Sequence, residues 1–159
     1  MCTFLFGGNM NLKYMDLAFM EAKKAYDNNE VPIGVVIVKD NSVLSLSYNK
    51  VETNNCAIYH AEIQAIIDAS KKVNNWRLDG CDMYTTLDPC PMCAGAIKQA
   101  RISNVYSALS TTSNINRTII NDIFTCADSS NPSVNFISNI SPDRAKVLLS
   151  EFFQKQRKK

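Results

Sequence analysis

Apolar residues between positions 12 and 26 recur every three or four positions, which predicts an amphipathic helix that ends at the polar run DNNE. Two runs rich in β-branched residues follow over 34–48 and flank Asp40 and Asn41, a pattern typical of a β-hairpin. Further along, we expect a helix over about 60–72, a strand at DMYTTL, a helix opening at DPCPMCAGAIKQA and a strand at SNVYSAL. Helices and strands therefore alternate along the first two thirds of the chain.

The last third begins with a segment rich in Ser, Thr and Asn over 110–133, where only TIINDIF indicates a short helix. VNFI predicts a short final strand. SPDRAKVLLSEFFQK predicts a final helix with Ser141 as its N-cap and Pro142 in its first turn. The alternation predicts an α/β fold with three layers, α/β/α, in which helices cover both faces of a central mixed five-stranded sheet.

The length of the chain bears on the number of domains, and its charge distribution bears on possible partners. The 159 residues, 46% of them hydrophobic, suit a single domain over 1–159, with 1–9 as an extension to which we assign no function. Four of the last five residues are basic: Lys155, Arg157, Lys158 and Lys159. Without them, 13 basic residues remain against 15 acidic ones, a net charge of −2. The basic tail over 155–159 suits an anionic partner and equally suits a solvated chain end.

Six cysteines accompany a start that has no basic leader and no small-residue cleavage site, so we expect a reducing, cytoplasmic location rather than a disulfide framework. No apolar stretch approaches the length needed to span a membrane, and no membrane partner is expected. We interpret Cys2, Cys56, Cys81 and Cys126 as small core residues. Cys56 precedes His60 closely enough to be an additional metal ligand.

His60 is the only histidine, and Cys90 and Cys93 follow it in a P-C-x-x-C motif. A catalytic zinc site commonly uses three nitrogen or sulfur ligands and keeps a fourth position for water. The predicted elements place each of the three residues at the start of a helix, and strand-to-helix crossovers bring successive helix starts to one edge of a sheet. The pattern therefore predicts one Zn²⁺ bound by His60, Cys90 and Cys93.

Glu62 lies two residues after the histidine, where a carboxylate can accept a proton from activated water and return it to a ring nitrogen and a leaving amine. Either half of the pattern alone is weak, because P-C-x-x-C also occurs in structural zinc sites and redox pairs. A redox pair, however, does not explain the lone histidine and its glutamate. Together, HAE and PCPMC match the H-x-E and P-C-x-x-C signature of zinc-dependent deaminases.

The stretches EVPIGVVIV, HAEI, TLDPCPMCAGAI, ARI and LLSEFFQKQR resemble the cytidine deaminase-like superfamily, and within it the bacterial tRNA-specific adenosine deaminases. The resemblance implies the cytidine deaminase-like fold and hydrolysis of the wobble adenosine in a tRNA anticodon stem-loop to inosine, with release of ammonia. It also implies a homodimer. Asp88 stands where the family usually has glutamate, Tyr59 where it has a small residue, and Thr111 where many members have aspartate.

The same resemblance implies three substrate contacts, and the positive charge of the tail suggests a fourth. Asn49 would contact the flipped base or its ribose, Ile33 would line the pocket, and the backbone amide of Ala61 would help to fix the base. Asn49 also suits a turn at a strand end, and Ile33 also suits the core. The basic residues of 155–159 would contact the RNA backbone.

Two other functions remain open from the sequence. A free-base deaminase acting on guanine or cytosine would have the same metal and fold, whereas the basic tail favours RNA. A non-catalytic zinc-binding subunit would also keep the fold. Glu62 favours an enzyme, because a structural zinc site needs no proton carrier.

Overall fold

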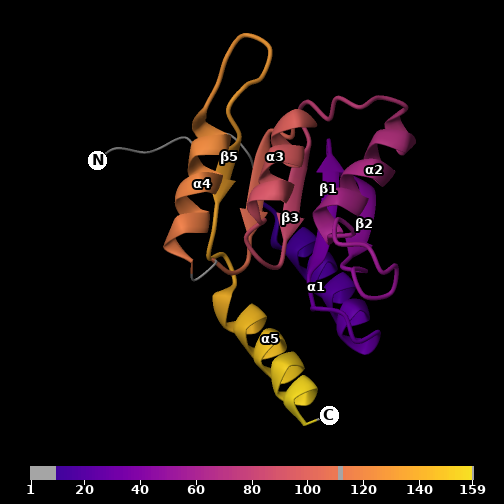
Figure 1. Ribbon diagram of the computed structural model, residues 1–159. Helices are drawn as coiled ribbons and strands as arrows, with labels where there is room; N and C mark the ends of the chain where they lie inside the picture. The colour runs from indigo at the N-terminus through magenta and orange to yellow at the C-terminus, as the bar shows by residue number, and fades with distance from the viewer. Residues whose placement is uncertain (1–9, 111–112, 159) are drawn as a thin grey trace.

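The computed structural model describes residues 10–110 and 113–158. Five strands form one sheet in the order β2-β1-β3-β4-β5, with helices on both sides of it (Figure 1). The strands are β1 (Gly34–Lys39), β2 (Ser42–Tyr48), β3 (Asp82–Thr85), β4 (Asn104–Ser107) and β5 (Asn135–Ile137). The helices are α1 (Leu12–Asp27), α2 (Ala61–Val73), α3 (Pro91–Gln99), α4 (Asn114–Thr125) and α5 (Pro142–Arg157).

The sheet is mixed, as predicted. β1 pairs antiparallel with both β2 and β3, whereas β3, β4 and β5 pair parallel to one another. Consequently β2, β3, β4 and β5 all run in the same direction, and their carboxyl ends meet at one edge of the sheet. In α/β sheets this edge is where ligands bind.

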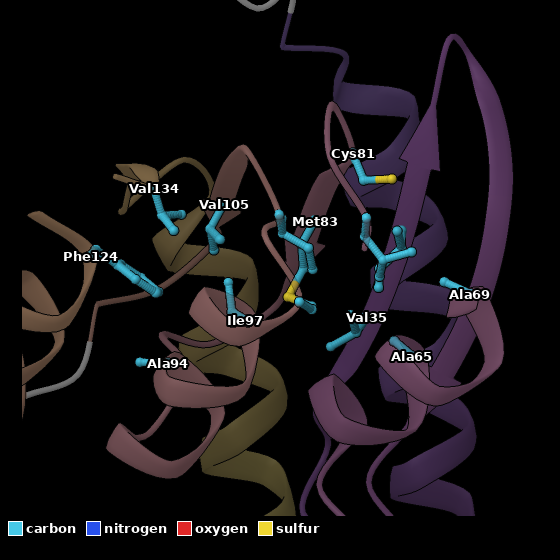
Figure 2. Close-up of a cluster of buried hydrophobic side chains, with 14 of the residues drawn as sticks. Val35, Ala65, Ala69, Cys81, Met83, Ala94, Ile97, Val105, Phe124 and Val134 are labelled. Atoms are coloured by element: carbon cyan, nitrogen blue, oxygen red, sulfur yellow. The ribbon is translucent and has the colours of Figure 1, made fainter. Parts of the chain in front are cut away.

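Three layers follow from the burial pattern. One face of the sheet packs against α2, α3 and α4 through a cluster that includes Val35, Met83, Ile97 and Phe124 (Figure 2). The other face packs against α1 and α5. Burying each large apolar side chain of this kind contributes roughly 1.5–3 kcal/mol. The predicted α/β/α arrangement with a five-stranded sheet is confirmed.

The close packing of α1 on β1 depends on one glycine. A Cβ atom added to Gly34 would lie 2.0 Å from the carbonyl oxygen of Ala18 and 2.4 Å from the backbone nitrogen of Ala22. Only a residue without a side chain lets the helix backbone approach the strand this closely.

The predicted helices and strands all form, with local differences. The hairpin turns at Asp40 and Asn41, whose φ angles are 48° and 61°. The weakly patterned segment holds a full helix, α4, because Ile120 and Phe124 bury one of its faces. Ser141 occupies the N-cap of α5, yet its side chain makes no capping hydrogen bond.

The cysteines differ in their environments. Cys81 lies in the core as expected, but Cys126 is exposed at the end of α4, so the core interpretation is wrong for it. Cys56 is half-buried, and Cys2 lies outside the described residues. Among the described residues, no helix is both long and apolar enough to cross a membrane.

Candidate active site

The three predicted metal ligands come together at the carboxyl edge of the sheet. His60 is the N-cap residue of α2, Cys90 is the N-cap residue of α3, and Cys93 lies in the first turn of α3. Their ligand atoms all lie within 4.8 Å of one another. His60 Nδ1 lies 3.7 Å from the sulfur of Cys90 and 3.5 Å from that of Cys93. Among the described residues, Cys56 is not part of this group.

These separations fit a tetrahedral zinc ion. Zn–S bonds of about 2.3 Å and Zn–N bonds of about 2.0 Å at a tetrahedral angle place the nitrogen and sulfur about 3.5 Å apart. The two measured distances match that value closely. The donor set, one imidazole nitrogen and two thiol sulfurs, is also one that zinc prefers. His60, Cys90 and Cys93 are therefore placed to hold the metal.

The two thiols share their protons unequally. The hydrogen bond with Cys93 lowers the pKa of Cys90 to about 5, while the same pairing and burial raise the pKa of Cys93. Both cysteines lie at the start of α3, where the helix dipole favours negative charge. The arrangement already favours one thiolate.

Glu62 is buried beside this group, with 2% of its surface exposed. Burial is the main reason that its pKa is raised to about 7. Its Oε2 atom finds no hydrogen-bond partner among the described residues. A buried carboxylate oxygen without a partner is costly in a structural role, so it points to a partner that comes with the reaction. That Glu62 is the proton carrier stays a prediction.

The three residues expected to contact the substrate lie around the same edge. Asn49, directly after β2, is buried, and its backbone N–H donates to the carbonyl oxygen of Ile33 over 3.1 Å. Ile33 is half-buried and packs against the apolar cluster beneath α2. Ala61 is fully buried as the first residue of α2, where a backbone N–H has no acceptor within the helix. Their contacts with a base stay predictions.

Tyr59 and Asp88, two of the departures from the family pattern, support the loops that carry the ligands. The carbonyl oxygen of Tyr59 accepts from the backbone N–H of Lys50 over 3.1 Å, which closes the loop before His60. The Oδ1 atom of Asp88 accepts from the hydroxyl of Ser138 over 2.6 Å. The third departure, Thr111, lies outside the described residues.

The basic tail divides into residues with different surroundings. Lys155 packs on α1, with its ammonium nitrogen 4.9 Å from the centre of the Tyr26 ring. Arg157 borders a hollow of about 250 Å³ on α5, and Lys158 is the C-cap residue of that helix. Lys159 lies outside the described residues. In Figure 1, α5 extends beyond the sheet next to the end of α1.

Sequence reasoning missed Glu30, a fully buried carboxylate in the segment between α1 and β1. It accepts a hydrogen bond from the side-chain amide of Asn49. Its signal was an acidic residue immediately before the apolar run VPIGVVIV.

The family described as the cytidine and deoxycytidylate deaminase zinc-binding region matches residues 9–109. The tRNA-specific adenosine deaminase of Bacillus subtilis (strain 168) is 37% identical over 147 residues, which is 92% of this chain and 90% of that protein. This chain belongs to the tRNA-specific adenosine deaminases. A solved structure from studies of A-to-I editing by tRNA:A34 deaminases superposes on this deaminase with a TM-score of 0.76. It is 31% identical, and the match covers 87% of this chain and all of that one.

The deaminase is also similar to the guanine deaminase of Bacillus subtilis. That structure superposes with a TM-score of 0.63 at 30% identity, covering 94% of this chain and 96% of that one. A fold of this kind is thus found both in a guanine deaminase and in tRNA deaminases.

Proposed function

We propose that the protein converts the wobble adenosine of a tRNA anticodon to inosine by hydrolysis, with release of ammonia. One observation carries this proposal: His60, Cys90 and Cys93 meet beside a buried glutamate, in a chain that is 37% identical to a tRNA-specific adenosine deaminase. The reaction requires an activated water and a proton carrier, and this site offers groups for both.

Zinc held by His60, Cys90 and Cys93 would act as a Lewis acid and lower the pKa of a bound water molecule. Glu62 then accounts for the proton movements. As the water oxygen bonds to C6 of adenine, the carboxylate takes a proton from it and delivers that proton to N1. Glu62 next moves the remaining hydroxyl proton to the amino nitrogen. The C6–N6 bond breaks, ammonia leaves, and C6 keeps a carbonyl oxygen.

Asn49, Ile33 and Ala61 hold the base in this proposal. The amide of Asn49 offers hydrogen-bonding groups and Ile33 offers an apolar contact. The N–H of Ala61, the first residue of α2, offers a donor that the helix itself does not use. A base must leave its stack to reach such a site, which costs less in a hairpin loop than in a duplex. The basic residues Arg157 and Lys158 then contact the stem phosphates.

The test is an assay of the purified zinc-loaded protein on an anticodon stem-loop with a wobble adenosine, with ammonia and inosine as readouts. Free guanine, cytosine and cytidine are assayed in parallel, because a guanine deaminase shares the fold. We expect ammonia only with the stem-loop. Turnover of guanine without turnover of the stem-loop would replace the proposal with a free-base deaminase, and no turnover with any of them would favour a non-catalytic zinc protein.

We also propose that the enzyme is a homodimer that joins through the outer side of α2 and α3. A hollow of about 290 Å³ there is lined by Ile66, Ser70, Trp76, Ala96, Gln99 and Ala100. Ala96→Arg would put a charge into this surface, and we expect a shift from dimer to monomer by light scattering. Met20→Arg is the control, because Met20 is 60% exposed on α1, on the other face of the sheet. A monomeric unmodified protein would contradict this proposal.

Because all five strands belong to one sheet, we propose a single zinc-dependent deaminase domain over 1–159. Its chemistry, on tRNA and with reduced cysteines, supports a cytoplasmic location.

A further inference from the structure

Glu30 is a buried acid that the proposed chemistry does not use. It lies between α1 and β1 with 0% of its surface exposed. Acidic side chains are almost never fully buried unless they are paired with donors or cations. Hydrogen-bond donors from Asn49, Glu52 and Thr53 meet this requirement.

Within the described part of the chain, the Glu30 carboxylate accepts three hydrogen bonds, all from the segment after β2. Oε2 accepts from the side-chain nitrogen of Asn49 over 3.1 Å and from the backbone N–H of Glu52 over 3.2 Å. Oε1 accepts from the backbone N–H of Thr53 over 2.6 Å. Both carboxylate oxygens are thus occupied by donors from one short stretch of chain.

Two of these donors begin a single helical turn. The N–H of Asn54 donates to the carbonyl oxygen of Lys50 over 3.0 Å, four residues back. The N–H groups of Glu52 and Thr53 stand at the start of that turn, where the turn itself provides no acceptor. Glu30 caps them from a distant segment, and its charge suits the positive end of the turn.

The third donor fixes which way the Asn49 amide faces. A carboxylate only accepts hydrogen bonds, so the NH₂ group of Asn49 must point to Glu30 and its carbonyl oxygen must point away. The backbone of Asn49 is held as well, because its N–H donates to Ile33. A neutral amide in place of Glu30 would have one acceptor oxygen for three donors, and the Asn49 amide would be free to turn over.

We infer that Glu30 is a positioning residue that sets the amide of Asn49, so that its carbonyl oxygen is presented as an acceptor to an N–H or O–H group of the nucleoside. This inference rests on the proposed function, since it needs a substrate at Asn49. Glu30 itself does not touch the substrate. It acts through the orientation of its neighbour.

A double-mutant cycle tests it, with kcat and KM measured on the anticodon stem-loop for Glu30→Gln, Asn49→Ala and the double variant. We expect each single change to lower kcat/KM about 10- to 100-fold, as small displacements at a reacting site do. The double variant should lose no more than Asn49→Ala alone, because Glu30 would act only through Asn49. If the losses in kcat/KM of the two single variants multiply in the double variant, the inference is wrong, whereas the proposed function still holds.

Controls separate positioning from folding. Glu21→Gln removes the charge of another buried glutamate, on α1, whose partner is Lys24, and should leave kcat/KM unchanged. Zinc content should stay at the unmodified level in every variant. Glu30→Asp keeps the charge but shortens the reach, and it takes the place of Glu30→Gln in the cycle if the latter fails to fold.

A second readout does not depend on activity. The side-chain NH₂ signals of Asn49, observed by ¹⁵N NMR, should shift in Glu30→Gln because a neutral amide with a single acceptor oxygen replaces the carboxylate. If the unmodified protein ignores the stem-loop, the proposed function fails and this signal alone decides about Glu30. Unmoved Asn49 signals overturn the inference.

Discussion

Nδ1 of His60 lies 3.5 Å from the sulfur of Cys93, although 33 positions separate the two residues. Two features bring them together: β2 and β3 run in the same direction, and each is followed by a segment that leads to the start of a helix. A zinc site therefore arises from the sheet topology and three side chains, with no dedicated metal-binding loop.

Replacing Cys90 or Cys93 by alanine should abolish zinc binding and turnover together. The unmodified protein should contain about one zinc per chain, and chelation should lower its melting temperature, because a ligand bound only to the native state stabilises it. Atomic absorption measures the metal. Cys56→Ser is the control, since Cys56 lies close in sequence but outside the ligand group. Zinc retained in full by Cys90→Ala would show that the ligand assignment is wrong.

Glu62→Gln should keep zinc and RNA binding and lose at least about 100-fold in turnover, because the amide cannot accept the proton. Single-turnover assays with saturating enzyme isolate this step from binding. Asp68→Asn removes an exposed carboxylate from the same helix and should retain activity. Near-normal turnover of Glu62→Gln would assign proton transfer to another group.

Gly34→Ala should destabilise the protein by about 3 kcal/mol or more, because the added methyl group collides with the backbone of α1. Gly95→Ala should do the reverse. A Cβ there meets nothing within 4 Å among the described residues, and alanine favours the helix by about 0.8–1.0 kcal/mol. Urea unfolding midpoints compare the two variants. Equal midpoints would contradict the close approach of α1 to β1.

Arg157→Gln with Lys158→Gln should weaken stem-loop binding and lower the dependence of log K on log salt by about 0.7–0.9 per lost phosphate contact. Lys155→Gln should change that slope less, because its ammonium group lies over Tyr26. Fluorescence anisotropy of a labelled stem-loop over a salt series gives both slopes. An unchanged slope in the double variant would mean that these charges are only solvated.

The free energy of unfolding should fall in alkaline solution. Burial raises the pKa of Cys81 from 9.0 to about 11 and that of Tyr106 from 10.0 to about 12. Between the ordinary and raised values the unfolded chain releases protons that the native state keeps, so rising pH favours unfolding. Below pH 9.0 these two groups should have no effect. Cys81→Ala should remove the earlier part of the decline in urea titrations, and a decline identical in both proteins would contradict this.

Much of the fold could be predicted because the pattern of burial is local. Two runs rich in β-branched residues over 34–48 flank two turn residues, and α1 carries its apolar stripe in sequence. The full length of α4 is harder to predict from the sequence, because its buried side chains Ile120 and Phe124 stand among polar residues. Its stability comes from packing on α3 and β5, which propensity does not report.

The metal ligands could be predicted because their chemistry demands particular residue types at fixed spacing. The role of Glu30 could not be predicted, because it depends on hydrogen bonds to residues about 20 positions away. Two of these residues lie in a turn that becomes visible only in the fold. Lys98 is similar. Its ammonium group is buried and donates to the carbonyl oxygens of Cys126 and Pro132, so it anchors a distant loop rather than facing solvent.

Trp76, which borders the hollow between α2 and α3, is the only tryptophan in the chain and is 54% exposed. The guanidinium groups of Arg77 and Arg101 lie 4.4 and 5.4 Å from its ring. An indole already in contact with water changes its emission little when the chain unfolds. Dissociation of a dimer joined at this surface would instead expose the ring and move its emission to longer wavelength, so the intrinsic fluorescence of the protein reports on subunit association without an added dye.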